Sequence, residues 1–98
     1  MERNLVFRVG SKRSRIEIYV DVLQAVRMGE NRPIKIMYHT NLSWKPLMQV
    51  LDALTEQNLI SLERKSIPAV YKITEKSLNV LNYFKKAIEL VEVKPLKS

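Results

Sequence analysis

The sequence predicts one small, mostly helical α+β domain, and three observations lead to this fold class. The chain has 98 residues, which suits one compact domain and not two. Apolar side chains make up 46% of the chain and charged ones 28%, as in an ordinary globular protein. The apolar residues recur at steps of three and four along most of the chain, whereas residues 59–73 have the pattern of extended strands. We therefore expect helices that pack around one core and a single hairpin near the end.

The first 13 residues form either a basic N-terminal arm or an additional short strand. Leu5, Phe7 and Val9 alternate with the side chains between them, which is typical of a strand with one apolar face. Gly10 then interrupts the pattern.

A first helix is expected from Ser14 to Met28. Ser14 and Glu17 have the spacing of a capping box, in which each side chain accepts a hydrogen bond from the backbone N–H of the other. The β-branched residues of this segment would also suit a strand, but the cap, the length and the spacing favour a helix. Gly29 suits the left-handed position that follows a helix. The residues of the predicted inward stripe are Ile16, Tyr19, Val20, Leu23 and Val26.

Two further helices are expected before residue 59. Pro33 suits the first position of a short helix, where its missing N–H group costs nothing, and Thr40-Asn41 ends this helix. Ser43 caps a longer helix, about 43–57, and Asn58 tolerates the left-handed conformation that stops it. The apolar side chains are Ile34, Ile36 and Met37 in the short helix, and Leu47, Val50, Leu51 and Leu54 in the longer one.

A hairpin and a last helix complete the prediction. Two strands, 59–62 and 69–73, are joined by the polar turn 63–68. Thr74 caps a final helix that runs to about Val91, because Pro95 prevents continuation.

This order of elements is that of a winged helix-turn-helix domain with an appended C-terminal helix. An all-helical bundle competes only if residues 59–73 are not a hairpin. We expect a basic N-terminal arm or extra strand over 1–13, the winged helix-turn-helix domain over 14–74, and the C-terminal helix with its tail over 75–98.

The charge of the chain points to a polyanionic partner. Seventeen Lys and Arg residues against ten Asp and Glu give a net charge of +7, and the pI is about 9.9. A domain with a pI above about 9 has the electrostatic character of a nucleic-acid binder. Residues 1–15 hold five basic side chains against Glu2 alone, so more than half of the excess lies in the first sixth of the chain.

The residue inventory excludes several other classes of protein. The chain has no cysteine and His39 is its one histidine, so disulfides, thiolate metal sites and histidine-rich metal centres are excluded, and a packed or hydrogen-bonded His39 ring is expected. Gly10 and Gly29 cannot form a phosphate-binding loop, and no catalytic constellation is present. We therefore expect neither an enzyme nor a cofactor. No apolar run exceeds three residues, and nothing resembles a secretory signal, so we expect no membrane span and a cytoplasmic, nucleoid-associated protein.

Three segments resemble an archaeal winged-helix family that includes the small basic chromatin proteins of the ten-kilodalton "10a" type and predicted transcription regulators. The segments are KIMYHTNLSW (35–44), NLI (58–60) and YKITEKS (71–77), and the resemblance covers roughly residues 14–84. It implies double-stranded DNA binding, no enzymatic activity and, in many members, dimers joined through a long C-terminal helix. The family commonly has glycine at the position of Ser77, and the C-terminal helix of this chain is shorter.

The predicted DNA contacts follow from the geometry of helix-turn-helix proteins, whose second motif helix lies in the major groove. Lys45 suits a guanine edge or a phosphate, and Gln49 suits adenine, whereas Asp52 lies too far along the helix. Trp44 either packs against the preceding helix or lies on a sugar–phosphate strand, and Tyr38 and Tyr71 are expected to be structural. The complete predicted DNA-binding set is Lys12, Arg13, Arg15, Arg32, Lys35, Ser43, Trp44, Lys45, Met48, Gln49, Arg64 and Lys65.

The last helix has more apolar residues than one packed face requires, which predicts a homodimer. The predicted interface consists of Leu78, Val80, Leu81, Tyr83, Phe84, Ala87, Ile88, Leu90 and Val91. The leading hypothesis is a DNA-binding transcription regulator or chromatin protein. The alternative is a winged-helix module that contacts another protein, since a fold alone does not determine a function.

Overall fold

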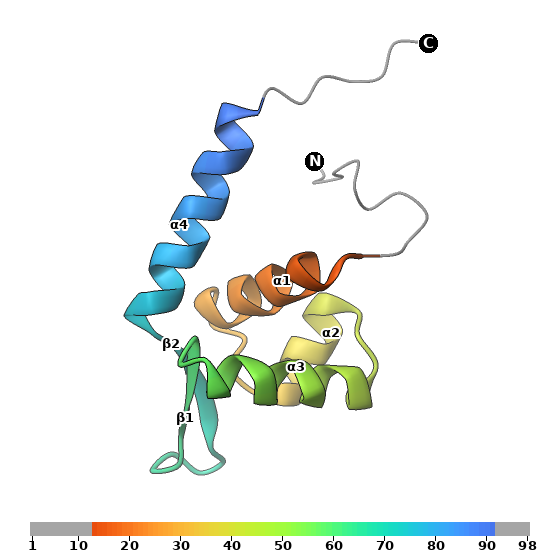
Figure 1. The fold of residues 1–98 in the computed structure, drawn as a ribbon. Coiled ribbons are helices and arrows are strands. Elements are labelled where there is room, and N and C mark those ends of the chain that lie inside the picture. Colours follow the sequence, from red (N-terminus) through yellow and green to blue (C-terminus); the bar gives the residue numbers. More distant parts are fainter. Residues whose placement is uncertain (1–12, 92–98) are drawn as a thin grey trace.

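Four helices and one two-stranded hairpin make up the part of the chain that the structure describes (Figure 1). The computed structural model describes residues 13–91. In chain order the elements are α1 (Arg15–Arg27), α2 (Pro33–Thr40), α3 (Trp44–Glu56), β1 (Ile60–Glu63), β2 (Val70–Ile73) and α4 (Glu75–Leu90). This order confirms the predicted mostly helical α+β fold, with a hairpin followed by a C-terminal helix. The predicted arm, apart from Arg13, and the predicted tail after Val91 lie outside the described residues.

The core lies where α1, α2 and α3 meet the base of the hairpin and the first turns of α4. The three leucines of the predicted α3 stripe, Leu47, Leu51 and Leu54, are fully buried, and Val50 beside them is half-buried. Helix α1 contacts every other helix and β2, so it is the central element of the domain. The buried apolar residues are Val20, Val22, Leu23, Ala25, Val26, Ile36, Leu47, Leu51, Leu54, Leu59, Ile60, Tyr71 and Leu81.

The buried side of α1 differs from the predicted stripe. Ile16 was expected to face the core, but it is 56% exposed, whereas Val22 and Ala25 are fully buried. The prediction assumed one packed face. Because other elements cover α1 on more than one side, its buried arc is wider than a single stripe and is rotated away from Ile16.

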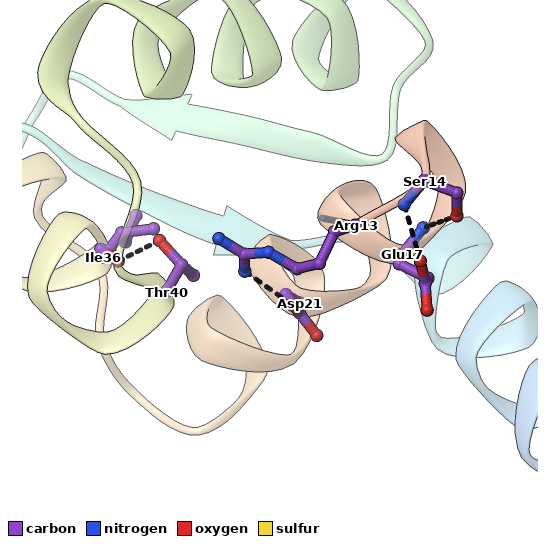
Figure 2. Close-up of polar contacts among 6 residues, drawn as sticks. All are labelled: Arg13, Ser14, Glu17, Asp21, Ile36 and Thr40. Atoms are coloured by element: carbon purple, nitrogen blue, oxygen red, sulfur yellow. Dashed lines mark hydrogen bonds and ion pairs between the residues drawn. The ribbon is translucent and has the colours of Figure 1, made fainter. Parts of the chain in front are cut away.

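The start of α1 has the predicted capping box (Figure 2). The Ser14 N–H donates to Glu17 Oε1 at 2.5 Å, and the Glu17 N–H donates to Ser14 Oγ at 3.2 Å. These two bonds satisfy N–H groups that have no partner within the helix. Glu17 is buried under the neighbouring elements, and within residues 13–91 its second oxygen, Oε2, has no hydrogen-bond partner.

Left-handed residues follow the first three helices; this conformation was predicted for Gly29 and Asn58, whereas Asn41 was predicted only to end its helix. Gly29 follows α1 with a φ of 102°, and Asn41 and Asn58 follow α2 and α3 with φ values of 62° and 60°. Glycine and asparagine tolerate this conformation better than other residues. At the end of α2, the buried Thr40 hydroxyl also donates to the Ile36 carbonyl at 2.7 Å (Figure 2).

The hairpin presents one apolar face to the core. Ile60 pairs with Ile73 and Leu62 pairs with Tyr71 in the antiparallel register. These four side chains are buried or half-buried, whereas Ser61 and Lys72, on the other face, are exposed. The backbone N–H of Tyr71 also donates to the Asn31 carbonyl at 2.8 Å, which ties β2 to the loop between α1 and α2. We refer to residues 60–73 as the wing.

Side chains at the start of α4 bind three successive carbonyl groups that follow α3, and we call residues 57–59 and 74–77 the α3–α4 junction. The pairs are Lys76 Nζ with Gln57 O at 2.8 Å, Thr74 Oγ1 with Asn58 O at 2.8 Å, and Ser77 Oγ with Leu59 O at 2.5 Å. Thr74 and Ser77 also form a reciprocal capping box. The fully buried Ser77 hydroxyl thus accepts a hydrogen bond from the Thr74 N–H and donates one to Leu59. A glycine at this position would lack both interactions.

Replacing Ser77 is therefore expected to destabilise the domain. Ser77→Ala leaves the Leu59 carbonyl and the Thr74 N–H without this partner inside the protein, so the free energy of unfolding should fall by about 1–2 kcal/mol. Urea denaturation followed by circular dichroism measures the change. The matched control is Ser43→Ala, because Ser43 caps α3 without a side-chain hydrogen bond and its removal should cost less than about 0.5 kcal/mol. Equal losses in the two variants would contradict this role for Ser77.

Candidate nucleic-acid interface

The outer side of α3 carries a row of polar side chains. Lys45, Gln49 and Asp52 are exposed, and their spacing of four and three residues places them on one line of the helix. Met48 was predicted to share this surface, but it is half-buried and packs against the core. Its position directly after the buried Leu47 places it at the border of the leucine stripe. The outward row of α3 is therefore narrower and more polar than predicted.

The first turn of α3 is open to solvent. Ser43, Trp44 and Lys45 are all exposed, and Trp44 keeps 50% of its surface accessible. The Ser43 hydroxyl makes no capping hydrogen bond. Proline occupies the third position of the helix, residue 46, and it has no N–H group to donate to that hydroxyl. The Ser43 hydroxyl is thus not committed to the helix cap.

Helix α2 adds basic and aromatic side chains to the surface beside α3. Arg32 and Lys35 are exposed as predicted. Tyr38 was expected to be structural with its hydroxyl at the surface, and His39 to be packed or hydrogen-bonded, but both side chains are exposed, Tyr38 by 75%. The helical period explains this result, because Tyr38 lies two residues after the buried Ile36 and so points to the opposite side of α2. Sequence reasoning missed Tyr38 as a surface residue, although that spacing was visible in the sequence.

The wing carries two exposed basic residues, Arg64 and Lys65, in the loop between its strands. Arg64 lies near Tyr71, and so does Asp52 of α3. Burial raises the pKa of the Tyr71 phenol above 10.0, the negative charge of Asp52 raises this pKa further, and the positive charge of Arg64 lowers it. The wing and α3 thus bring opposite charges close to the buried phenol of Tyr71.

The basic residues predicted to contact DNA at the N-terminal end of the domain differ in their exposure to solvent. Arg13 donates to Asp21 Oδ2 at 2.8 Å, and both side chains are only 15% exposed (Figure 2). This ion pair turns Arg13 toward α1 and away from the solvent, contrary to the predicted surface role. Arg15 is exposed, and Lys12 lies outside the described residues.

The elements that carry the exposed predicted residues lie together. In Figure 1, α3 and the hairpin occupy the lower part of the domain, with α2 adjoining the start of α3, while α4 rises away in the opposite direction. Helix α2 packs on α3, and α3 packs on β1. Helix α3 thus connects α2, at its start, with the wing, at its other end. Arg15 extends from a separate element, the first turn of α1.

Helix α4 has two apolar sides with different surroundings. The predicted interface residue Leu81 is buried in the core, and Val80 and Phe84 pack partly against it, so these three residues serve the fold of the monomer. Ile88 is half-buried. The remaining predicted residues, Leu78, Tyr83, Ala87, Leu90 and Val91, are exposed, Leu90 by 85%.

A groove with a volume of about 750 Å³ separates α1 from α4. Its apolar wall consists of Val20, Leu78, Leu81, Phe84 and Ile88, and its polar part includes Glu17, Asp21, Gln24, Arg27, Lys85 and Glu89. The polar part carries both signs of charge. The groove thus lies on the side of α4 that faces α1.

The chain belongs to a class of proteins that this arrangement defines, the winged helix-turn-helix family, whose model matches residues 12–92. It is also similar to an uncharacterized protein, MJ0287, of the archaeon Methanocaldococcus jannaschii. The two are 25% identical over 84 residues, which cover 86% of this chain and 82% of the relative. Winged helix-turn-helix domains are typically DNA-binding.

Residues 13–91 lack two other features, a metal-binding cluster and a membrane-spanning helix. No cluster of three or more histidine or acidic side chains there could hold a metal ion. None of the helices described has both the length and the apolar character needed to cross a bilayer.

The environment of Tyr71 predicts a loss of stability at alkaline pH. The raised pKa means that the folded protein holds the phenol proton more tightly than the unfolded chain does. The resulting stabilisation is complete below pH 10 and is lost as the pH rises through the raised pKa. Urea denaturation at about pH 8 and about pH 11 should therefore show a smaller fall in stability for Tyr71→Phe than for the wild type. The control is Tyr83→Phe, which removes an exposed phenol. Its free energy of unfolding should decrease between the two pH values as much as that of the wild type. An equal decrease in all three proteins would contradict the proposed environment of Tyr71.

Proposed function

We propose that this protein binds double-stranded DNA with α3 in the major groove and the wing on the adjacent backbone. The observation that carries the proposal is the exposed polar row of α3 beside a basic wing, in a winged helix-turn-helix chain of net charge +7. The major groove is about 12 Å wide and admits one α-helix, whose first residues approach the base edges. Lys45 and Gln49 lie on the exposed side of α3 in its first two turns.

Each exposed residue has a role that matches its chemistry. Lys45 binds a guanine edge or a phosphate, and Gln49 pairs with adenine through its amide. The exposed Ser43 hydroxyl and the Trp44 ring contact the sugar–phosphate strand at the start of α3. Arg64 and Lys65 bind phosphates on the wing side, and Arg32, Lys35 and Arg15 extend the phosphate footprint, which sets affinity and register more than sequence preference. Arg13 has no such role in the proposal, because Asp21 holds it against α1.

The carboxylate of Asp52 limits where the phosphates can lie. This side chain is exposed on the same row of α3, toward the wing. A phosphate close to it would be repelled, so the duplex backbone must approach at the start of α3 and at the wing loop. This pattern supports a groove contact made mainly by the first two turns of the helix.

The second part of the proposal is that the protein forms a homodimer joined through α4. Tyr83, Ala87 and Leu90 leave an apolar strip exposed on the side that does not pack on α1, and large exposed apolar patches usually mark interfaces. A strip of this kind suits a contact in which the same surface of two copies meets across a two-fold axis. Dimeric helix-turn-helix proteins bind half-sites about 34 Å apart, one turn of DNA, and the proposed dimer follows this operator geometry.

Within this proposal the protein acts as a transcription regulator or as a chromatin protein located on the nucleoid. The resemblance to the small basic archaeal chromatin proteins supports a chromatin role. The presence of one compact winged helix-turn-helix domain is compatible with both roles. A second candidate function, a protein-interaction module, is favoured by one observation. Tyr38 and Trp44 expose aromatic rings on α2 and α3, and aromatic residues are enriched at protein–protein interfaces.

Binding to DNA at several salt concentrations tests the leading proposal. Affinity should fall steeply with salt, and Lys45→Ala with Arg64→Ala should reduce the slope of log K against log salt by about 0.9 for each lost phosphate contact. Fluorescence anisotropy with a labelled duplex measures the slope. Lys86→Ala is the matched control, because it removes an exposed positive charge from α4 and should leave the slope unchanged. A wild-type slope in the double variant would contradict the assigned surface, and absence of duplex binding by the wild type would favour the protein-interaction module.

Sedimentation equilibrium tests the dimer. The wild type should sediment with twice the mass of the 11.5 kDa chain. Tyr83→Asp with Leu90→Asp should restore the mass of one chain, because both side chains are exposed in the monomer and their replacement leaves the core intact. Glu75→Gln, at the exposed start of α4, should not change the mass. A wild-type mass of one chain at tens of micromolar would remove the dimer from the proposal.

A further inference from the structure

The loop between the strands of the wing carries an apolar residue that the phosphate contacts do not explain. Ile67 is 96% exposed, more than any other large hydrophobic residue within residues 13–91. Its neighbour Pro68 is exposed as well. Hairpin loops normally carry Gly, Asn, Asp or Ser, because these residues suit tight turns and interact with water. Ile67 and Pro68 provide a tip without any side-chain hydrogen-bonding group.

The charges around this tip favour a polyanionic partner over an apolar one. Arg64 and Lys65 are exposed in the same loop. The acidic residue nearest to them in the sequence, Glu63, forms an ion pair with Lys72 across the strands, with Nζ and Oε1 3.5 Å apart. The positive charges of Arg64 and Lys65 therefore lack a compensating carboxylate within the loop itself. A loop with an apolar tip and flanking positive charges has the composition of a segment that enters a nucleic-acid groove.

The position of the tip matches this chemistry. In Figure 1 the hairpin extends beyond α3, and its loop is the part of the wing that lies farthest from α1 and α4. When α3 lies in the major groove, a wing that follows the backbone beside it reaches the adjoining minor groove. Strand β2 of the wing is tied to the rest of the domain, because the Tyr71 N–H binds the Asn31 carbonyl.

We propose that Ile67, together with Pro68, is an apolar wedge that enters the minor groove next to the site bound by α3, and that it partly unstacks one base step and bends the duplex. Isoleucine and proline are among the side chains that act in this way, and the resulting kinks run from about 20° to 90° toward the major groove. The wedge adds selection for deformable steps such as TA and CA, which unstack more easily than A-tracts. This inference rests on the proposed DNA binding and assigns the wing a mechanical role beyond phosphate contact.

Energy transfer between dyes at the two ends of a short duplex tests the wedge. The wild type should shorten the end-to-end distance of a duplex rich in TA and CA steps more than that of an A-tract duplex of equal length. Ile67→Ser should lose most of this bend and keep the salt slope of the wild type, because Arg64 and Lys65 remain. Ile67→Phe, which retains an apolar wedge, should keep the bend. The high exposure of residue 67 means that neither variant removes a core contact.

The outcomes separate this inference from the proposal on which it rests. Loss of the bend in Ile67→Ser, with the bend kept in Ile67→Phe, supports the wedge. Salt-dependent binding to a straight duplex, or an equal bend with Ile67→Ser, overturns the wedge and leaves the DNA-binding proposal in place. Failure of the wild type to bind any duplex overturns both.

Discussion

Hydrogen bonds from the start of α4 to the carbonyl groups after α3 are the constraint on which the rest of the structure depends. The chain leaves α3 at Gln57, forms the wing and returns at Thr74, so the bonds of the α3–α4 junction close the base of the wing. The Ser77 hydroxyl has no access to water, and its bond to Leu59 lies in the interior. Hydrogen bonds of this kind are costly to break without replacement. They hold α3, the wing and α4 in one arrangement.

Net charge alone does not decide which positive residues can serve the interface; their placement does. Arg13 is held by Asp21 against α1, and Lys72 is paired with Glu63 across the wing. Exposed pairs of the second kind contribute little to stability, but they do lower the local positive potential. For the candidate interface, the basic residues that stay exposed on α3 and in the wing loop, including Lys45 and Arg64, are therefore more informative than the net charge of +7.

The fold was readable from the sequence because its signals are local. The caps at Ser14 and Thr74, the left-handed Asn41 and Asn58, and the leucine stripe of α3 each depend on residues within one or two turns of a helix. The two caps, the left-handed Asn58 and the leucine stripe were expected and are confirmed, and the order of elements follows from them; Asn41 was expected only to end α2.

What the sequence could not supply is the set of neighbours that each helix acquires on folding. Ile16 is exposed and Val22 is buried because α1 is covered from several directions, a property of the assembled domain and not of its own periodicity. The Arg13–Asp21 pair depends on how the chain enters α1. For the candidate interface, exposure of Lys45, Gln49, Arg64 and Lys65 agrees with the sequence analysis, whereas the exposed Tyr38 was missed.

The bond between Tyr71 and Asn31 has a consequence for the entropy of complex formation. An isolated two-stranded ribbon is marginal in water, but here β2 continues its backbone hydrogen bonding into the loop before α2, and the apolar face of the ribbon is covered by the core. The strands of the wing are consequently ordered before any partner arrives. On association only the short segment between Glu63 and Val70 remains to be immobilised, so more of the contact energy is retained as affinity.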